Sequence, residues 1–267
     1  MGGWVNYESK QGTIRAYAAE PKTPKPWPAL IIIHGVNGNR PHMADVAQDF
    51  ANDGYLAIVP DIYSNDAGYK DQVEEDILAA AHVGPYGGDP VKQKAFLDSM
   101  SEERRASIMR ARAWIDQRPT KTYIEIIEGA FHYLKNRPDV GAVGCMGFCM
   151  GGRLTGELAV TGVDLAAGVI YYGQHPKLDL VSNIKCPIEG HYGITDKGIT
   201  GKVPDFDKAM KEAGKDFSYF IYDADHGFSL MPGSRSYNEA CAKLSLERTK
   251  KFLAKHLKPA ALRSAAE

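Results

Sequence analysis

The chain has 267 residues, of which 44% are hydrophobic, and its 32 Lys and Arg residues are balanced by 33 Asp and Glu residues. A length and composition of this kind support one large globular domain with a sizeable core. The near-zero net charge excludes the strong positive field with which proteins gather nucleic acid or an acidic membrane surface.

Targeting signals and cysteine usage predict the cellular compartment. The N-terminal residues contain neither the basic nor the apolar segment of a signal peptide, and the apolar runs are far shorter than the ~20 residues of a membrane span. The cysteines, which are Cys145, Cys149, Cys186 and Cys241, lack the spacing of a disulfide framework, as is typical of reduced thiols. We therefore expect a cytoplasmic protein with no membrane or nucleic-acid partner, and the sequence leaves its oligomeric state open.

The N-terminal part of the chain begins an alternation of buried strands and helices. Residues 29–35 read ALIIIHG and are apolar on both faces, which predicts a central parallel strand covered by helices on both sides. Residues 41–54 follow with apolar side chains at helical spacing and a closing glycine, and they predict a helix. Residues 55–63 predict a second buried strand, which ends at Pro60.

Residues 65–119 interrupt this alternation. They are polar, with helical segments separated by the turn sequence GPYGGDP, and they lie between a strand and the next core helix. Insertions at such positions of open α/β sheets commonly build a cap. We expect a cap-like insertion, and the alternative of a peripheral helical excursion without contact to a substrate stays open.

The alternation resumes after the insertion and continues to the C-terminal region. Helices are predicted at 121–138, 150–160, 203–214 and 234–256, and strands at 139–147, 165–173, 186–193 and 215–223. Repeated strand–helix–strand units imply right-handed crossovers between parallel strands. The predicted fold class is α/β, with a mostly parallel, doubly wound sheet flanked by helices, in a single domain spanning residues 1–267.

The segment GFCMGG places Cys149 between a predicted strand and a predicted helix. This is the context of a nucleophile elbow, in which the reactive side chain occupies a strained turn. Gly147 and Gly151 flank Cys149 where a Cβ atom would clash with neighbouring backbone. A helix N-terminus stabilises a thiolate and lowers the pKa of the thiol. Cys149 is therefore the candidate nucleophile.

An acid and a base follow Cys149 in the order nucleophile, acid, histidine. Asp196 follows the strand at 186–193, and His226 follows the strand at 215–223. Catalytic groups of open α/β sheets gather at these carboxyl ends. We expect His226 to exchange protons with the thiol and with water, and Asp196 to orient the imidazole.

Two backbone N–H groups are candidates for an oxyanion hole. Met150 directly follows the candidate nucleophile, and Val36 lies in the HGVNG loop after the first buried strand. In an elbow of this type, donors at these two positions stabilise the negative charge that develops on the carbonyl oxygen during acyl transfer.

Other residues with reactive side chains have simpler interpretations. Cys145 is expected to be a buried core residue, because no partners for a zinc or redox site occur at a matching spacing. A phosphate-binding loop is disfavoured because no Lys–Ser or Lys–Thr pair follows the glycines. Asp225 could rival Asp196, but neighbours in sequence rarely form a side-on hydrogen bond to a histidine ring. Structural roles are expected for His34, His191 and Asp61.

Three side chains are candidates for substrate binding. Tyr63 follows the second buried strand, and Trp114 and Arg110 lie in the insertion. The insertion also carries other arginines, namely Arg104, Arg105 and Arg112. A solvated helix face explains these arginines equally well.

Several motifs together resemble the dienelactone hydrolase (carboxymethylenebutenolidase) family. They are IIIHGVNG, AIVPDIYS, MGFCMGGR, ITDKGI and DADHGF, and the resemblance covers most of residues 12–256. GFCMGG is the most specific motif, because most α/β-hydrolases place serine at the elbow and this family places cysteine. The resemblance implies a single α/β-hydrolase domain, hydrolysis of small-molecule enol-lactones and related esters, and no metal or organic cofactor.

Two positions depart from the pattern of the family. Gly35 stands where the family often has a glutamate that is implicated in activating the thiol, and Leu230 stands where characterised members have an arginine. We therefore expect the ionisation of the resting thiol to be controlled differently from that of the family. The sequence also gives no support for an acidic dienelactone as the preferred substrate.

The leading hypothesis is an ester or lactone hydrolase that acts through a Cys149–His226–Asp196 triad and a covalent acyl-enzyme. One alternative keeps the triad and directs it at other activated electrophiles, such as phosphotriesters. Another is a catalytically idle hydrolase scaffold with a binding or redox-sensing role.

Overall fold

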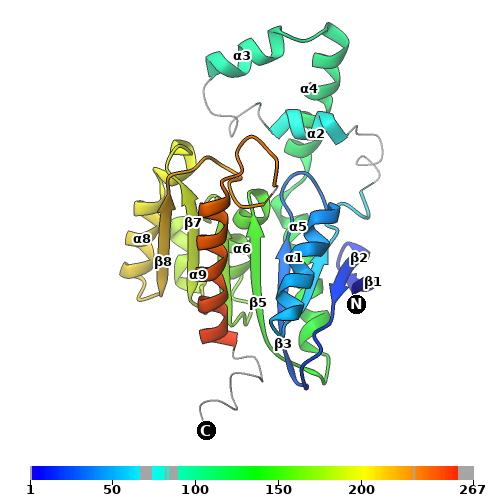
Figure 1. The fold of residues 1–267 in the computed structure, drawn as a ribbon, viewed down its shortest axis with the longest axis vertical. Helices are drawn as coiled ribbons and strands as arrows, with labels where there is room; N and C mark the ends of the chain where they lie inside the picture. Colours follow the sequence, from blue (N-terminus) through cyan, green and yellow to red (C-terminus); the bar gives the residue numbers. More distant parts are fainter. Residues whose placement is uncertain (1, 67–73, 82, 84–89, 231, 258–267) are drawn as a thin grey trace.

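The computed structural model describes residues 2–66, 74–81, 83, 90–230 and 232–257, and one eight-stranded sheet organises this part of the chain (Figure 1). The strands are β1 (Gly2–Ser9), β2 (Gly12–Ala19), β3 (Trp27–Ile33), β4 (Leu56–Pro60), β5 (Val140–Phe148), β6 (Ala167–Tyr171), β7 (Ile188–Gly193) and β8 (Phe217–Tyr222). Their order across the sheet is β1-β2-β4-β3-β5-β6-β7-β8. The β1–β2 and β2–β4 pairs are antiparallel and the other pairs are parallel, so the predicted mostly parallel sheet is confirmed.

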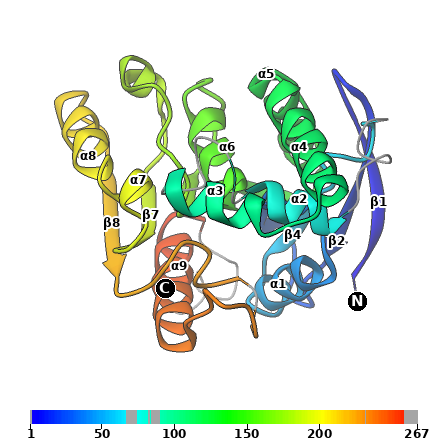
Figure 2. The same cartoon turned by 90° about the horizontal axis from the view of Figure 1, so that it is seen from above.

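Helices cover both faces of the sheet (Figure 2). On one face lie α1 (Pro41–Asn52) and α9 (Glu239–Leu257), and on the other lie α5 (Thr120–Lys135), α6 (Met150–Ala159) and α8 (Val203–Glu212). All seven residues of β3 are buried, with Ile31 in one core cluster and Ile32 in the other. Successive side chains of a strand point to opposite faces, so a continuous apolar run requires cover on both sides.

The described residues of the insertion form helices beyond the carboxyl end of the sheet (Figure 1). These are α2 (Glu74–Ala81), α3 (Pro90–Asp98) and α4 (Glu102–Gln117). The buried Asp76 carboxylate joins α2 to α4 through an ion pair with Arg104 and a hydrogen bond from Ser107. The predicted helical insertion is therefore present. The GPYGGDP turn lies outside the described residues except for Pro90, and the role of the insertion as a cap stays a prediction.

The sheet begins earlier than the sequence patterns indicate. No strand is predicted within residues 2–19, where the structure has the antiparallel pair β1–β2. Tyr7 is the one buried residue of β1, and an edge strand with exposed side chains carries little hydrophobic signal. The last helix begins at Glu239 rather than at residue 234, because the Asn238 side chain caps it by accepting from the Cys241 N–H at 3.1 Å. Within the described ranges, no helix has both the length and the apolar character needed to cross a membrane.

Candidate active site

Cys149 occupies the sharp turn between β5 and α6. Its backbone has φ 56° and ψ −115°, a conformation that a residue other than glycine adopts only where surrounding contacts hold it. One such contact is the hydrogen bond from the Cys149 N–H to the Tyr171 carbonyl oxygen of β6, at 3.0 Å. The turn therefore presents the thiol at the carboxyl end of the sheet, as a nucleophile elbow does.

The glycines around Cys149 leave room for this turn. A Cβ atom on Gly147 would lie 2.2 Å from the Gly151 carbonyl oxygen, and one on Gly151 would lie 2.2 Å from the Ile33 carbonyl oxygen. These oxygens belong to the backbone of α6 and β3 and cannot move aside without disturbing close-packed elements. The predicted steric reason for both glycines is confirmed.

His226 and Asp196 come from different loops and form a direct hydrogen bond. Asp196 lies between β7 and the short helix α7 (Lys197–Thr200), and His226 follows β8. His226 Nδ1–H donates to Asp196 Oδ2 at 2.6 Å, which leaves Nε2 as the ring nitrogen available to the thiol. Asp225 is exposed and accepts a hydrogen bond from the Thr195 hydroxyl instead. Asp196, and not its rival, is the carboxylate that holds the imidazole.

The charges around Cys149 favour an ionised thiol. Burial is the largest single influence and raises the pKa of Cys149, but the positive charge and hydrogen bond of His226 and a hydrogen bond from the Met150 N–H hold that pKa below its ordinary value. Burial lowers the pKa of His226, but the Cys149 thiolate and the Asp196 carboxylate together raise it to about 10. The two side chains therefore favour each other's charged forms, a thiolate on Cys149 and an imidazolium on His226.

The remaining cysteines lie in environments that keep them protonated. Cys145 is fully buried within β5, and burial raises the pKa of its thiol to about 12. Cys186 is also buried, and its pKa is raised to about 12 for the same reason. All four cysteines are free. The prediction that Cys145 is a core residue is confirmed.

The two candidate oxyanion donors come from the start of α6 and from the loop after β3. Met150 begins α6, and its N–H already bonds the Cys149 sulfur. Val36 lies on the loop after β3, and the peptide that carries its N–H is held through the Gly35 carbonyl oxygen. That oxygen is 2.7 Å from His34 Nδ1 and accepts from the Gly38 N–H at 3.2 Å. Because the N–H and C=O of one peptide point in opposite directions, these contacts fix the direction of the Val36 N–H.

His34 is structural, as predicted, and its role can be stated more closely. The ring is completely buried, and burial holds its pKa below the ordinary value, so the imidazole is neutral. Nε2 accepts from the Ile62 N–H at 3.3 Å, so Nδ1 carries the proton and donates to the Gly35 carbonyl oxygen. His34 therefore ties the oxyanion loop to the segment that follows β4.

The candidate substrate-binding residues occupy different surroundings. Tyr63 is 1% exposed and Trp114 is 9% exposed, and their rings meet edge to face with centroids 5.0 Å apart. They lie at the base of the insertion. Arg110 lies on the exposed side of α4, and no contact found among the described residues brings it to the other candidates. Arg112 is buried rather than solvated, and it bonds Asp116 and the Val83 carbonyl oxygen.

Tyr172 is a residue at the site that sequence reasoning missed. It has φ 37° although it is not glycine, its ring centroid lies 5.0 Å from that of His226, and its hydroxyl is 3.1 Å from the Ser229 hydroxyl. The YYG sequence at the end of β6 is the available signal. Leu230 packs against the hydrophobic core cluster that also contains Tyr172, so an apolar side chain stands where the family resemblance implies a cation.

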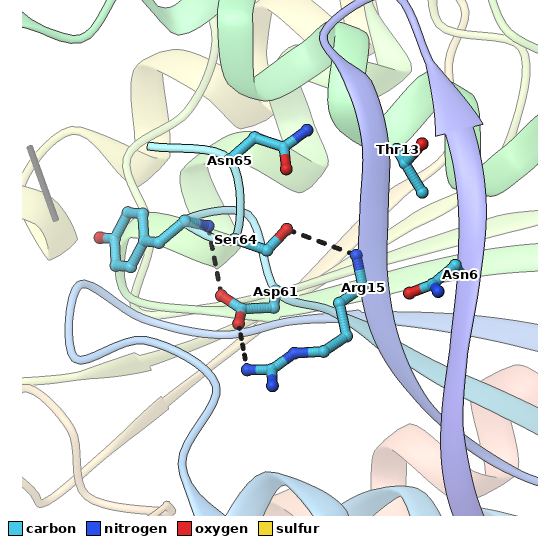
Figure 3. Close-up of a pocket in the computed structure, with 7 residues that line it drawn as sticks. Asn6, Thr13, Arg15, Asp61, Ser64 and Asn65 are labelled. Atoms are coloured by element: carbon cyan, nitrogen blue, oxygen red, sulfur yellow. Dashed lines mark hydrogen bonds and ion pairs between the residues drawn. The ribbon is translucent and has the colours of Figure 1, made fainter. Parts of the chain in front are cut away.

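A polar pocket whose lining does not include Cys149 lies beside the β1–β2 pair (Figure 3). Its volume is about 460 Å³, and its lining residues are Asn6, Thr13, Arg15, Asp61, Tyr63, Ser64 and Asn65. Asp61 pairs with Arg15 at 3.0 Å and accepts from the Tyr63 N–H at 3.3 Å. These contacts bind the loop after β4 to β2 and agree with the structural role predicted for Asp61. Among the residues that the structure describes, no three His, Cys, Asp or Glu side chains are grouped as metal ligands.

Comparison with known proteins agrees with this architecture. The dienelactone hydrolase family profile matches residues 14–257. The chain is 29% identical over 253 residues to the "Putative carboxymethylenebutenolidase" of Saccharolobus solfataricus. This alignment covers 93% of this chain and 96% of that protein. It resembles the crystal structure of the "Putative Dienelactone Hydrolase" of Klebsiella pneumoniae with a TM-score of 0.72 and 23% identity over 95% of this chain and 98% of that one.

A further solved structure has the same fold. A dienelactone hydrolase-like promiscuous phosphotriesterase from metagenomic libraries is similar with a TM-score of 0.66 and 18% identity over 96% of this chain and 98% of that one. These structures confirm the predicted α/β-hydrolase fold. Since the family profile spans nearly the whole described chain, the protein belongs to the dienelactone hydrolase family of hydrolases.

Proposed function

We propose that this protein hydrolyses small carboxylic esters or lactones by covalent catalysis at Cys149. The observation that carries the proposal is the linked set at the carboxyl end of the sheet: a strained cysteine with a lowered pKa bonds His226, which in turn bonds Asp196 at 2.6 Å. A nucleophile, a base and a group that orients the base are the parts that acyl transfer requires. Membership of the family and the name of the Saccharolobus relative support the same substrate class.

In the acylation step, the Cys149 thiolate attacks the carbonyl carbon and forms a carbon–sulfur bond. The carbonyl oxygen becomes an oxyanion, which accepts hydrogen bonds from the N–H groups of Met150 and Val36. When this intermediate collapses, the carbon–oxygen bond to the leaving group breaks. The leaving alkoxide takes the proton of the His226 imidazolium, and a thioester on Cys149 remains.

In the deacylation step, the now neutral His226 takes a proton from water, and the resulting hydroxide attacks the thioester. The carbon–sulfur bond breaks, the carboxylic acid leaves, and the thiolate–imidazolium pair is restored. The His226 side chain is 39% exposed, so water can approach the ring. Asp196 keeps Nδ1 protonated throughout and presents Nε2 to the reacting atoms.

The surroundings of the triad favour an uncharged substrate. Leu230 packs against the same hydrophobic core cluster as Cys149 and provides no positive charge for a substrate carboxylate. At Gly35 no carboxylate competes with the thiolate, which relies on His226 and on the N-terminus of α6. We therefore expect a neutral ester to be a better substrate than an acidic dienelactone.

The test compares Cys149→Ala with a matched control, Cys241→Ala, which removes a partly buried thiol on α9. With p-nitrophenyl butyrate and with an enol-lactone, Cys149→Ala should lose essentially all turnover, whereas Cys241→Ala should keep it. During turnover by the wild type, mass spectrometry after acid quench should detect the acyl group on Cys149. Undiminished hydrolysis by Cys149→Ala would refute the mechanism.

A second candidate keeps the triad and changes the electrophile. A resting thiolate is a soft nucleophile that also attacks activated phosphotriesters, and the metagenomic structural neighbour is described as a promiscuous phosphotriesterase. Parallel kcat/KM values for an ester and a phosphotriester panel decide between the two. An idle scaffold predicts that both panels are inert and that iodoacetamide labels Cys149 at pH 6 no faster than it labels a free thiol.

A further inference from the structure

Tyr63 connects the insertion to the proposed oxyanion hole. It follows β4, is 1% exposed, and donates its hydroxyl hydrogen to the Val36 carbonyl oxygen at 3.0 Å. The same hydroxyl lies 3.8 Å from the Met150 sulfur. A single buried side chain therefore contacts both residues whose N–H groups are proposed to hold the oxyanion.

The contact with Tyr63 completes the fixation of Val36. On the N-terminal side of Val36, the Gly35 carbonyl oxygen is held by His34 and by the Gly38 N–H. On the C-terminal side, the carbonyl oxygen of Val36 itself is held by Tyr63. A residue whose two flanking peptides are both bonded has little freedom to rotate its N–H away from a reacting atom. Loss of the Tyr63 hydroxyl removes the hydrogen bond that this side chain donates to the Val36 carbonyl oxygen, on the C-terminal side of Val36.

Tyr63 is itself held by residues at the base of the insertion. Asp66 and α4 meet there, because Asp66 Oδ2 accepts from Trp114 Nε1 at 3.0 Å and pairs with Arg118 Nε at 2.9 Å. We call Asp66, Trp114 and Arg118 the neck. The Trp114 ring packs edge to face on Tyr63 at 5.0 Å, and Arg118 also donates to the Ile62 carbonyl oxygen at 3.0 Å. The neck thus fixes both the ring of Tyr63 and the backbone before it.

We propose that Tyr63 is a positioning residue through which the neck of the insertion sets the geometry of the oxyanion hole. The inference rests on the proposed ester hydrolysis, and it assigns the insertion a part in catalysis that requires no contact with substrate. An oxyanion donor acts mainly in the transition state, so its misplacement lowers kcat and leaves substrate binding nearly unchanged. The role differs from that of a substrate-binding tyrosine, whose loss would raise KM.

The first experiment is Tyr63→Phe, which keeps the ring in the neck and removes the hydroxyl. Its matched control is Tyr192→Phe, since Tyr192 is equally buried at 1% and its hydroxyl has no hydrogen-bond partner among the described residues. With p-nitrophenyl butyrate, kcat of Tyr63→Phe should fall about tenfold, less than the ~10²–10³-fold cost of deleting an oxyanion donor outright. KM should stay within about twofold of wild type, and Tyr192→Phe should behave as wild type.

Alkylation of Cys149 by iodoacetamide supplies a second readout, because this reaction forms no oxyanion and needs only the thiolate. Its rate in Tyr63→Phe should equal that of wild type. Asp66→Asn weakens the neck from the other end and should lower kcat in the same direction. The double variant should then be no slower than Tyr63→Phe alone, because both changes act through one path.

Several results would overturn the inference while leaving the hydrolase proposal intact. These are an unchanged kcat in Tyr63→Phe, a raised KM at constant kcat, an equal loss in alkylation and in turnover, or additive losses in the double variant. Should Tyr63→Phe fold poorly, Asp66→Asn is judged by the same split between turnover and alkylation. Hydrolysis that survives Cys149→Ala would instead refute the proposed function itself, so the two failures are distinct.

Discussion

A carboxylate introduced at Gly35 should oppose the resting thiolate of Cys149. A Cβ atom built on Gly35 would lie 3.6 Å from the Cys149 Cβ and 3.4 Å from the Phe148 carbonyl oxygen, both ordinary van der Waals contacts. The site therefore accepts the first carbon of a side chain, and we take a separation of about 5 Å between the sulfur and the carboxylate of Gly35→Glu for the estimate. Two like charges at that distance repel by about 3 kcal/mol at an effective dielectric constant of about 20.

Solvent reduces this repulsion, because the neighbouring His226 is 39% exposed, and about 1–2 kcal/mol is a realistic remainder. A tenfold change in an equilibrium constant corresponds to about 1.4 kcal/mol, so the ratio of thiolate to thiol at Cys149 should fall about tenfold. The assay is the rate of iodoacetamide alkylation of Cys149 across pH, with Gly35→Gln as an uncharged control of the same shape. If Gly35→Glu and Gly35→Gln alkylate at the same rate at pH 6, charge does not control this thiol and the electrostatic reasoning is wrong.

Three further predictions follow from the same geometry. His226 lowers the pKa of Cys149, and the pKa of His226 is raised to about 10. The rate of alkylation should therefore reach its plateau at a lower pH than for a free thiol, and a rise at the same pH as for a free thiol would contradict the ion pair. Ester hydrolysis should decline near pH 10, as the imidazolium loses the proton that the leaving group takes. Asp196→Asn should lower kcat by about 10³–10⁴-fold, because the uncharged amide no longer fixes the tautomer of the imidazole or stabilises its positive charge. Asp225→Asn removes a charge that faces Thr195 rather than His226 and should change kcat less than about twofold. Equal effects would place the wrong carboxylate beside the histidine. Gly151→Ala would set a Cβ atom 2.2 Å from a backbone oxygen of β3 and should lower the free energy of unfolding by about 3 kcal/mol or more. The measurement is the urea midpoint, which should fall at an unchanged m-value. Gly35→Ala is the control, and equal midpoints for the two variants would show that the backbone around Cys149 relaxes without cost.

The amino-acid sequence by itself determined the elements that carry Cys149, Asp196 and His226. Helices cover both sides of strands such as β3 and β5, so both faces of these strands must be apolar. An uninterrupted run of apolar residues therefore identifies them in the sequence. The glycines around Cys149 follow from a local steric demand. The order of nucleophile, acid and histidine along the chain then placed Asp196 and His226 after successive parallel strands, whose carboxyl ends meet at one edge.

Other features depended on contacts between residues far apart in the chain. The exposed edge strand β1 has little hydrophobic pattern of its own, and its pairing with β2 is what makes it a strand. The sequence favoured Asp196 over Asp225, but the contacts that separate them, with His226 and with Thr195, depend on the positions of two loops. Tyr172 follows β6 and His226 follows β8, and their rings meet because both strands pair with β7 and end at the same edge of the sheet.

The supports of the oxyanion loop were decided by tertiary structure alone. The partners of His34 and Tyr63 are the backbone groups of Gly35, Val36 and Ile62, and every residue has such groups, so no sequence motif identifies them. A backbone N–H or C=O finds its partner through the fold and not through the identity of its own side chain. The sequence thus determined which side chains are able to react, and the folded chain decided which backbone groups are held in place around them.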